Sequence, residues 1–160
     1  RRWVQTVEEC ALFFDELAEA GLDIVSFHHE AVDDPAPIIA KARGAGLRVG
    51  MTLNLETPVE ASFGYLEELD DLMLMSIRPG WAGQELNPDI YPRLETARGE
   101  VDRRGLGIAI EIDGGVKAHN AKRAVDAGAT VLVAASALFG SSDPARAARE
   151  LAAIARGEAA

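Results

Sequence analysis

The amino-acid sequence predicts an α/β fold built around a parallel β-sheet. Short apolar runs alternate with segments of helical periodicity along the whole chain. Several of these runs are apolar at nearly every position, which is typical of parallel strands that are covered by helices. No hairpin signal joins neighbouring runs, so each strand is expected to reach the next one through a helix.

Five β-rich runs are predicted as strands, and six further segments as helices. The first predicted helix has Thr6 and Glu9 at capping-box spacing and places Cys10 on its apolar, buried face. The second begins on Pro35 and ends before Gly46, which is the usual order of these two residue types at helix ends. The strands cover residues 23–28, 47–53, 72–77, 108–112 and 131–135, and the helices cover 6–20, 35–45, 58–69, 88–104, 118–127 and 144–156.

A short repeat marks the junctions between helices and strands. The tripeptide Ala-Gly-(Leu or Ala) occurs at residues 20–22, 45–47 and 127–129, each time between a predicted helix and the next strand. We therefore expect a repeated helix-then-strand unit, in which the glycine ends the helix and the chain turns back toward the sheet.

The length of the chain limits the number of such units. Crossover units take about 30 residues each, so 160 residues hold roughly five. A complete (β/α)₈ barrel usually needs at least about 200 residues, which leaves either a small open sheet or a barrel without its first part. Because the first residue is Arg1 and not Met, we expect an incomplete piece of a longer protein. No linker divides residues 1–160, so a single domain is predicted.

Charge and composition argue against several classes of partner. The chain has 26 Asp and Glu against 16 Lys and Arg, a formal net charge of −10, and so lacks the basic face that nucleic acid or an anionic membrane requires. The single cysteine, Cys10, excludes an internal disulfide and a cysteine-based zinc site, which favours a reducing, cytoplasmic setting. The most apolar window, residues 131–139, is far shorter than the roughly 20 residues of a membrane span, and no secretory signal is visible.

Candidate functional residues follow the predicted strands, because ligands bind at the carboxyl ends of the strands in both candidate folds. The residues at these ends are His28, His29 and Glu30 after the first strand, Asn54, Thr57 and Pro58 after the second, 78–84 after the third, Asp113, Gly114 and Gly115 after the fourth, and Ser136 after the fifth.

The last three strand ends predict an anion site. Gly114 and Gly115 allow the backbone to approach a ligand, and the helix after them offers free N–H groups to a phosphate. Ser136 and the loop at residues 80–84 add further donors. The alternative is that the glycines only form tight turns, but a Trp and a Gln inside the Gly-flanked loop favour a binding role.

Asp113 is the candidate for proton transfer. A carboxylate at the end of an apolar strand is partly desolvated, which raises its pKa and lets it accept a proton from carbon. The alternative is a helix or turn cap. His28 and Glu30 share a face of their strand and could act as ligands, but a hydrogen-bonded structural pair is the favoured interpretation. Met73 and Met75 are expected in the core.

Read in order, these motifs resemble the ribulose-phosphate 3-epimerase family. The similarity extends from about residue 7 to residue 139, and the Pro-Gly-x-x-Gly-Gln loop is far more specific than Asp-Gly-Gly. The matching segments are His-His-Glu at 28–30, Leu-Asn-Leu-Glu-Thr-Pro at 53–58, Met-Ser-Ile-Arg-Pro-Gly-Trp-Ala-Gly-Gln at 75–84, Asp-Gly-Gly-Val at 113–116 and Val-Ala-Ala-Ser-Ala-Leu-Phe at 133–139.

The resemblance implies a TIM (β/α)₈ barrel of the ribulose-phosphate-binding type, of which this chain would supply strands four to eight. It implies epimerisation at C3 of D-ribulose 5-phosphate to D-xylulose 5-phosphate, in which two aspartates exchange the proton through an enediolate. A divalent metal ion (Zn²⁺, Fe²⁺, Mn²⁺ or Co²⁺) would stabilise the oxyanion. Asp113 would be both metal ligand and catalytic acid/base. The substrate-binding residues would be Met75, Gly80, Gly83, Gln84, Gly114, Gly115, Ala135 and Ser136.

The sequence departs from the family pattern in several places. The family's opening motifs (a Ser, a His-x-Asp pair and a further His) have no counterpart, and they supply the other metal ligands and the second aspartate. We therefore expect these residues alone to be inactive, and the full-length enzyme to be a homo-oligomer. Leu55 replaces a proline, whereas Ala82 and Ala135 replace glycines. Ala135 is expected to crowd the phosphate or to change which sugar phosphate fits.

Alternative functions stay open. The Ala82 pattern also occurs in C3 epimerases of ketohexose 6-phosphates such as allulose 6-phosphate. An aldolase or decarboxylase of the same barrel group, such as hexulose-phosphate synthase, would keep Asp-Gly-Gly but has no need for Pro-Gly-x-x-Gly-Gln. A non-catalytic sugar-phosphate-binding barrel would keep only the phosphate loops. In each case the expected partner is a small-molecule sugar phosphate.

Overall fold

The computed structural model describes residues 7–80 and 83–158. Within them a five-stranded sheet has its strands in chain order, and every neighbouring pair is parallel. This confirms the predicted parallel α/β arrangement. The strands are β1 (Ile24–His28), β2 (Arg48–Leu53), β3 (Asp71–Met75), β4 (Ala109–Asp113) and β5 (Val131–Val133).

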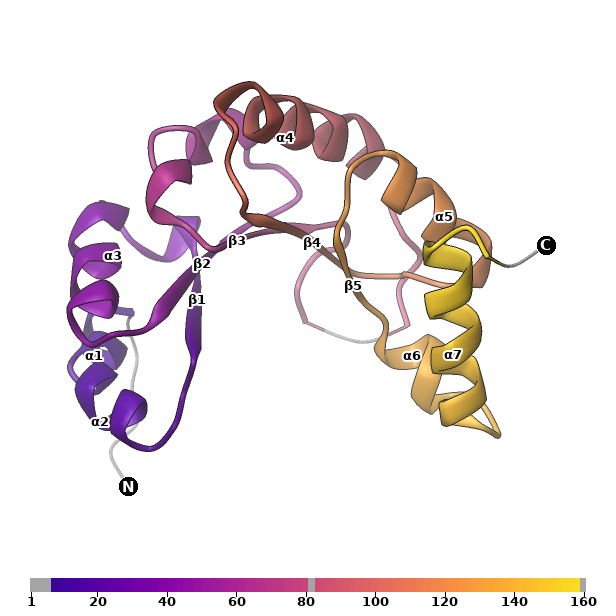
Figure 1. Cartoon of the computed structure of the whole chain (residues 1–160), viewed down its shortest axis with the longest axis horizontal. Coiled ribbons are helices and arrows are strands. Elements are labelled where there is room, and N and C mark those ends of the chain that lie inside the picture. The colour runs from indigo at the N-terminus through magenta and orange to yellow at the C-terminus, as the bar shows by residue number, and fades with distance from the viewer. Residues whose placement is uncertain (1–6, 81–82, 159–160) are drawn as a thin grey trace.

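The sheet curves into an arch, with helices along its convex side and an open concave side (Figure 1). Strands that stay adjacent in chain order, with their helices on the outside, have the arrangement of part of a (β/α)₈ barrel. A doubly wound sheet would instead reverse its strand order and carry helices on both faces. Of the two predicted architectures, the structure has the incomplete barrel.

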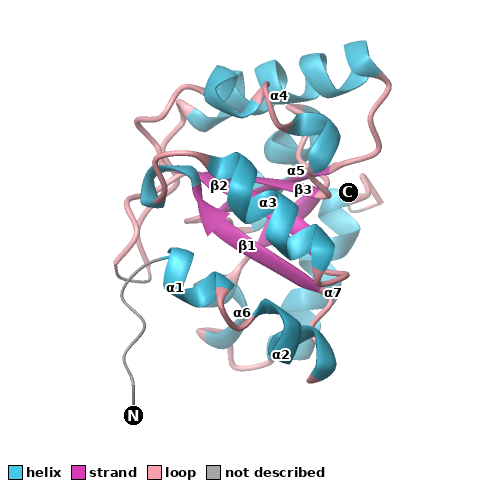
Figure 2. Ribbon diagram, turned by 90° about the vertical axis from the view of Figure 1, so that its left-hand side faces the viewer, coloured by secondary structure: helices cyan, strands magenta, loops and turns pink. Residues whose placement is uncertain are grey.

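Helices connect the strands and cover the outer face of the sheet. Figure 2 shows α3 on this outer side, in front of the strands. Within residues 7–80 and 83–158, no helix reaches the length and apolar character that crossing a bilayer requires. The helices are α1 (Val7–Ala11), α2 (Phe14–Glu19), α3 (Pro35–Gly44), α4 (Ile90–Arg104), α5 (Ala118–Asp126), α6 (Ala135–Phe139) and α7 (Pro144–Ala155).

The two faces of the sheet differ in polarity, because side chains alternate along each strand. On the concave face, the register aligns Ser26, Gly50 and Asp71 in one row, and pairs Met75 with Asp113 near the carboxyl ends. The outer face packs against the helices and forms the apolar core. Its fully buried strand residues are Val49, Met51, Leu53, Leu72, Leu74, Ile110 and Ile112.

The segment predicted as one helix over 6–20 is two short helices, α1 and α2. Phe13 donates its N–H to the carbonyl of Cys10 at 3.0 Å, a bond to three residues back that ends α1 in a tight turn. The break interrupts the expected apolar face, and Cys10 is exposed, so its predicted burial is wrong. Thr6 of the expected capping box lies outside the described residues.

The helix predicted over 58–69 is also wrong. Two 3₁₀ turns, η2 (Val59–Ser62) and η3 (Leu66–Glu68), occupy this stretch. The hydroxyl of Ser62 donates to the carbonyl of Val59 at 2.7 Å, and backbone N–H groups here likewise bond three residues back. These bonds favour turns of three residues over the wider α-helical turn.

The other four predicted helices are confirmed, with ends that differ by one or two residues. The helix α6 was not predicted. The run at 131–135 was expected to be extended throughout, but β5 ends at Val133 and α6 begins at Ala135. The Ala-Ser-Ala-Leu sequence there favours a helix, so the chain changes from strand to helix directly at the carboxyl edge of the sheet.

The repeated Ala-Gly-(Leu or Ala) tripeptide performs the predicted turn. Gly21, Gly46 and Gly128 all have a positive φ, at +94°, +79° and +116°. The residue after each glycine donates its N–H to the carbonyl five residues earlier at 3.0 Å, which is the Schellman arrangement that ends a helix. Each helix therefore turns directly back to the sheet.

Candidate active site

A pocket of about 430 Å³ lies on the concave side, at the carboxyl ends of the strands. Every residue predicted for catalysis or substrate binding lines it, with the exception of Gln84. The structure thus brings together strand ends that are far apart in the sequence. The lining residues are His28, Met73, Met75, Ile77, Pro79, Gly80, Gly83, Asp113, Gly114, Gly115, Val116, Val133, Ala134, Ala135 and Ser136.

Asp113 is the last residue of β4, and hydrogen bonds to its backbone carbonyl hold it in place. Its carbonyl accepts the Ser76 N–H at 2.8 Å and the Ser76 hydroxyl at 3.2 Å. These bonds fix the strand end while the carboxyl group faces the pocket. Burial raises the pKa of the Asp113 carboxyl above its ordinary value. A carboxylate in this position is a stronger base than one in water.

Gly114 and Gly115 fit tightly between β4 and the β3–α4 loop. Gly114 has φ +120°, and a Cβ atom there would lie 2.5 Å from the side chain of Ile77. Gly115 has φ +64°, and a Cβ atom there would lie 2.3 Å from the backbone nitrogen of Leu86. The Ser76 hydroxyl also donates to the Gly114 carbonyl. Close packing therefore requires both glycines, and both also line the pocket.

The turn from Gly115 into α5 is fixed by Asn120. The Asn120 side chain accepts the Lys117 N–H at 2.8 Å and donates to the Gly115 carbonyl at 3.0 Å. Asn120 itself is only 8% exposed. The amino-terminal turn of α5 is thereby held next to the pocket, where its positive dipole end favours an anion.

Gln84 closes the loop between β3 and α4. Its side-chain amide donates to the carbonyl of Arg78 at 2.8 Å, and the structure places it outside the pocket lining. Gln84 thus has a loop-closing contact, and its predicted role in substrate binding stays a prediction. Trp81 and Ala82, from the same loop motif, lie outside the described residues.

His28 and Glu30 lie close together, but not as the expected hydrogen-bonded pair on one strand, because Glu30 lies in the 3₁₀ turn η1 (His29–Ala31) and His28 Nδ1 has no hydrogen bond to a described residue. The Nδ1 atom of His28 is 3.5 Å from a carboxylate oxygen of Glu30. The other oxygen accepts the Asn54 N–H at 2.8 Å and the Thr57 hydroxyl. Burial alone would raise the pKa of Glu30, but these hydrogen bonds and the nearby His28 lower it, so Glu30 is a stable anion.

Several pocket residues were missed by the sequence reasoning. His28 was interpreted as structural and Met73 as core, yet both line the pocket. Residues of β3 at alternate positions from Met75 share its face, and this alternation could have identified Met73. Ile77, Pro79, Val133 and Ala134 are pocket residues of the same segments for which no chemical signal exists.

Comparison with known proteins agrees with these features. A family model described as the ribulose-phosphate 3 epimerase family matches residues 5–139. The chain belongs to the ribulose-phosphate 3-epimerase family. Its matched region contains all five strands and the lining residues of the pocket.

Two bacterial members of the ribulose-phosphate 3-epimerase family illustrate the similarity. The ribulose-phosphate 3-epimerase of Mycobacterium tuberculosis is 38% identical over 130 residues, which are 81% of this chain and 57% of that protein. The ribulose-phosphate 3-epimerase of Bacillus subtilis is 34% identical over 146 residues, which are 91% of this chain and 67% of that protein. The chain spans little more than half of the length of the mycobacterial relative.

Solved structures share the fold of this epimerase-family chain. A crystal structure of 3-hexulose-6-phosphate synthase superposes with a TM-score of 0.68 and 26% identity, covering 93% of this chain and 70% of that one. Orotidine 5'-phosphate decarboxylase from Pyrococcus horikoshii has a TM-score of 0.69 at 20% identity, covering 97% and 71%, which supports the fold alone. The (β/α)₈-type architecture is thus confirmed.

The family resemblance also implies a divalent metal ion. Among residues 7–80 and 83–158, no group of three or more His, Cys, Asp or Glu side chains is placed to hold a metal. Protein metal sites take several donors from the chain. The described residues therefore do not by themselves fit a metal site.

Proposed function

We propose that the complete protein epimerises D-ribulose 5-phosphate at C3 to give D-xylulose 5-phosphate. The observation that carries this proposal is the position of Asp113. A carboxyl group whose pKa is raised by burial faces a pocket that also contains the glycines and Ser136 expected to hold a phosphate. Membership of the ribulose-phosphate 3-epimerase family supports the same reaction.

Asp113 acts as the base on one face of the substrate. Its carboxylate accepts the proton from C3, the electron pair of the C3–H bond forms the C2=C3 bond, and the C2 carbonyl oxygen becomes an enediolate oxygen. Return of a proton to the opposite face of C3 then gives the epimer. One carboxyl group cannot reach both faces, so a second acid, from another part of the complete protein, supplies that proton.

The phosphate group binds at the β4 and β5 ends of the pocket. Gly114 and Gly115 keep the pocket wall free of side chains, and the amino-terminal turn of α5 follows directly. Ser136 contributes an exposed hydroxyl, and the methyl group of Ala135 narrows the same wall. Gly80 and Gly83, from the β3–α4 loop, also line the pocket.

A divalent metal ion is also part of the proposal for the complete protein, with Asp113 as one ligand. Such an ion supplies Lewis-acid stabilisation of a developing oxyanion. The identity of the ion, a cytoplasmic location and a homo-oligomeric state are predictions that rest on the sequence and the family resemblance.

The reaction is tested by following solvent deuterium into the substrate. The complete protein is incubated in D₂O with D-ribulose 5-phosphate, or with allulose 6-phosphate in a parallel sample, and C3 is observed by NMR. We expect exchange and formation of xylulose 5-phosphate in the first sample. Exchange in allulose 6-phosphate alone would instead assign a ketohexose epimerase, and binding without exchange would assign a non-catalytic sugar-phosphate protein.

A further inference from the structure

His28 lines the pocket, but the proposed reaction gives it no role. It is the last residue of β1, whereas Ser136 follows β5, so β2, β3 and β4 lie between them in the sheet. The phosphate end of the pocket is built on β4 and β5. His28 therefore lies across the sheet from the phosphate end, where the sugar chain of a bound sugar phosphate extends.

One edge of the His28 ring is turned away from solvent. The Nδ1 atom is buried and lies 3.5 Å from the Glu30 carboxylate, without a hydrogen bond to any described residue. The side chain as a whole is 39% exposed, so its exposed part is the remainder of the ring. A neighbouring carboxylate favours a proton on Nδ1, which leaves Nε2 of the neutral ring as a hydrogen-bond acceptor.

Glu30 is held firmly enough to orient this ring. One of its oxygens accepts the Asn54 N–H at 2.8 Å and the Thr57 hydroxyl, while the other faces His28. A carboxylate with three polar neighbours on two oxygens has little freedom to rotate. Its lowered pKa keeps it charged at neutral pH, so its attraction for an Nδ1 proton persists.

Arg93 extends the same arrangement to the next strand. Its guanidinium donates to the carbonyls of Asn54 at 2.8 Å, Thr57 at 2.9 Å and Met75 at 3.1 Å. The loop that holds Glu30 is thereby fixed to the end of β3, where Met75 lines the pocket. Hydrogen bonds thus connect Glu30, which lies beside His28, to the end of β3 at Met75.

We propose that His28 is a substrate-binding residue that accepts a hydrogen bond from a hydroxyl of the sugar chain, and that Glu30 is its positioning residue. This inference rests on the proposed function, because it assumes a sugar phosphate whose phosphate lies at the β4 and β5 ends. The ligand class is a polyhydroxylated ketose chain. Inorganic phosphate, which has no such chain, does not contact His28.

Calorimetric titration of the complete protein with two ligands tests the inference. D-ribulose 5-phosphate and inorganic phosphate are titrated into the unaltered protein and into His28→Ala, His28→Gln and Glu30→Gln. We expect His28→Ala to lower the affinity for D-ribulose 5-phosphate by about tenfold, since one hydrogen bond is lost. The affinity for inorganic phosphate should not change. His28→Gln keeps an acceptor and is expected to restore part of the affinity. Glu30→Gln is expected to lower only the affinity for D-ribulose 5-phosphate, and by a smaller factor than His28→Ala.

Arg149→Ala is the control, because Arg149 is exposed on α7 and does not line the pocket. It should change neither affinity. Two results would overturn this inference but not the proposed function. One is an equal loss of affinity for both ligands in the His28 and Glu30 variants. The other is an unchanged affinity for D-ribulose 5-phosphate in His28→Ala and His28→Gln. Failure of the unaltered protein to bind either ligand would overturn the proposed function, and this inference with it.

Discussion

Met75 and Asp113 lie opposite each other in the parallel pairing of β3 and β4, and both line the pocket. Met75 is only 5% exposed, so a nearly buried thioether side chain adjoins the carboxyl group at the strand end. An apolar neighbour disfavours the charged form of a carboxyl group. The pairing thus contributes to the burial that raises the pKa of Asp113.

Replacing Met75 by glutamine should lower the pKa of Asp113 toward its ordinary value. The amide stabilises the carboxylate by a hydrogen bond and reduces its desolvation. Met75→Leu keeps an apolar side chain of similar size and should leave the raised pKa in place. Carboxyl-detected NMR titration of Asp113 in both variants checks this. Identical titration curves for the two variants would mean that Met75 does not influence Asp113.

Asp71 should make the protein less stable as the pH rises. Burial and the charge of Glu111 raise the pKa of Asp71 from 3.8 to about 7. Between these two pH values the folded state therefore binds more protons than the unfolded state, so the free energy of unfolding falls as pH increases. The total loss should amount to a few kcal/mol, because the free energy of unfolding falls by about 1.4 kcal/mol for each pH unit between the two values.

Asp71→Asn should remove most of this pH dependence and raise stability above pH 7, measured by urea unfolding at pH 4 to 8. Asp70→Asn is the contrasting neighbour. Asp70 accepts the Val49 N–H at 2.8 Å and pairs with Arg43 at 2.8 Å, so this variant should be destabilised. A free energy of unfolding for Asp71→Asn that declines from pH 4 to 7 as steeply as in the unaltered protein would show that another group is responsible.

Gly115→Ala should destabilise the fold. The positive φ of Gly115 and the backbone nitrogen of Leu86, 2.3 Å from an added Cβ, leave no room for a methyl group. A cost of about 1–3 kcal/mol is expected from the backbone strain alone. Gly107→Ala serves as control, because nothing lies within 4 Å of an added Cβ there. Equal melting temperatures for the two variants would contradict the close approach of Leu86.

Sequence reasoning located most of the site because parallel strands bring their carboxyl ends to one edge. Asp113, Gly114 and Ser136 could be found from strand ends alone. The position of His28 followed from its strand end as well, but its place in the pocket lining did not, because the interpretation favoured a structural pair with Glu30. The loop-closing bond from Gln84 to the Arg78 carbonyl could not be predicted, because it depends on the path of the loop.

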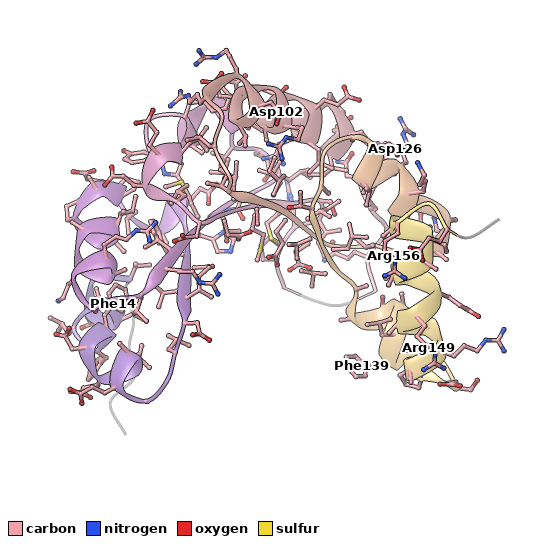
Figure 3. All side chains as sticks on the ribbon, in the orientation of Figure 1. Phe14, Asp102, Asp126, Phe139, Arg149 and Arg156 are labelled. Carbon is pink, nitrogen blue, oxygen red and sulfur yellow. The ribbon has the colours of Figure 1, made fainter. Side chains whose placement is uncertain are left out.

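The errors in the fold have local physical causes. The segment at 58–69 has a helix-like pattern, but the Ser62 hydroxyl favours a three-residue turn. The unpredicted helix α6 is short and ends at Phe139, which is 81% exposed. Figure 3 shows Phe139 at the lower end of the right-hand limb of the arch, on its open side. Periodicity alone could not distinguish this short helix from the end of a strand.

Asp113→Asn shows whether Asp113 is the base that removes the C3 proton. The complete protein and this variant are compared in D₂O with D-ribulose 5-phosphate, and the rate of deuterium entry at C3 is measured by NMR. Asp126→Asn, an exposed change on α5 (Figure 3), is the control and should exchange normally. If Asp113 is the base, its variant should lose at least about 10² in exchange rate while inorganic phosphate still binds. Exchange at the normal rate in Asp113→Asn would place the base at another residue.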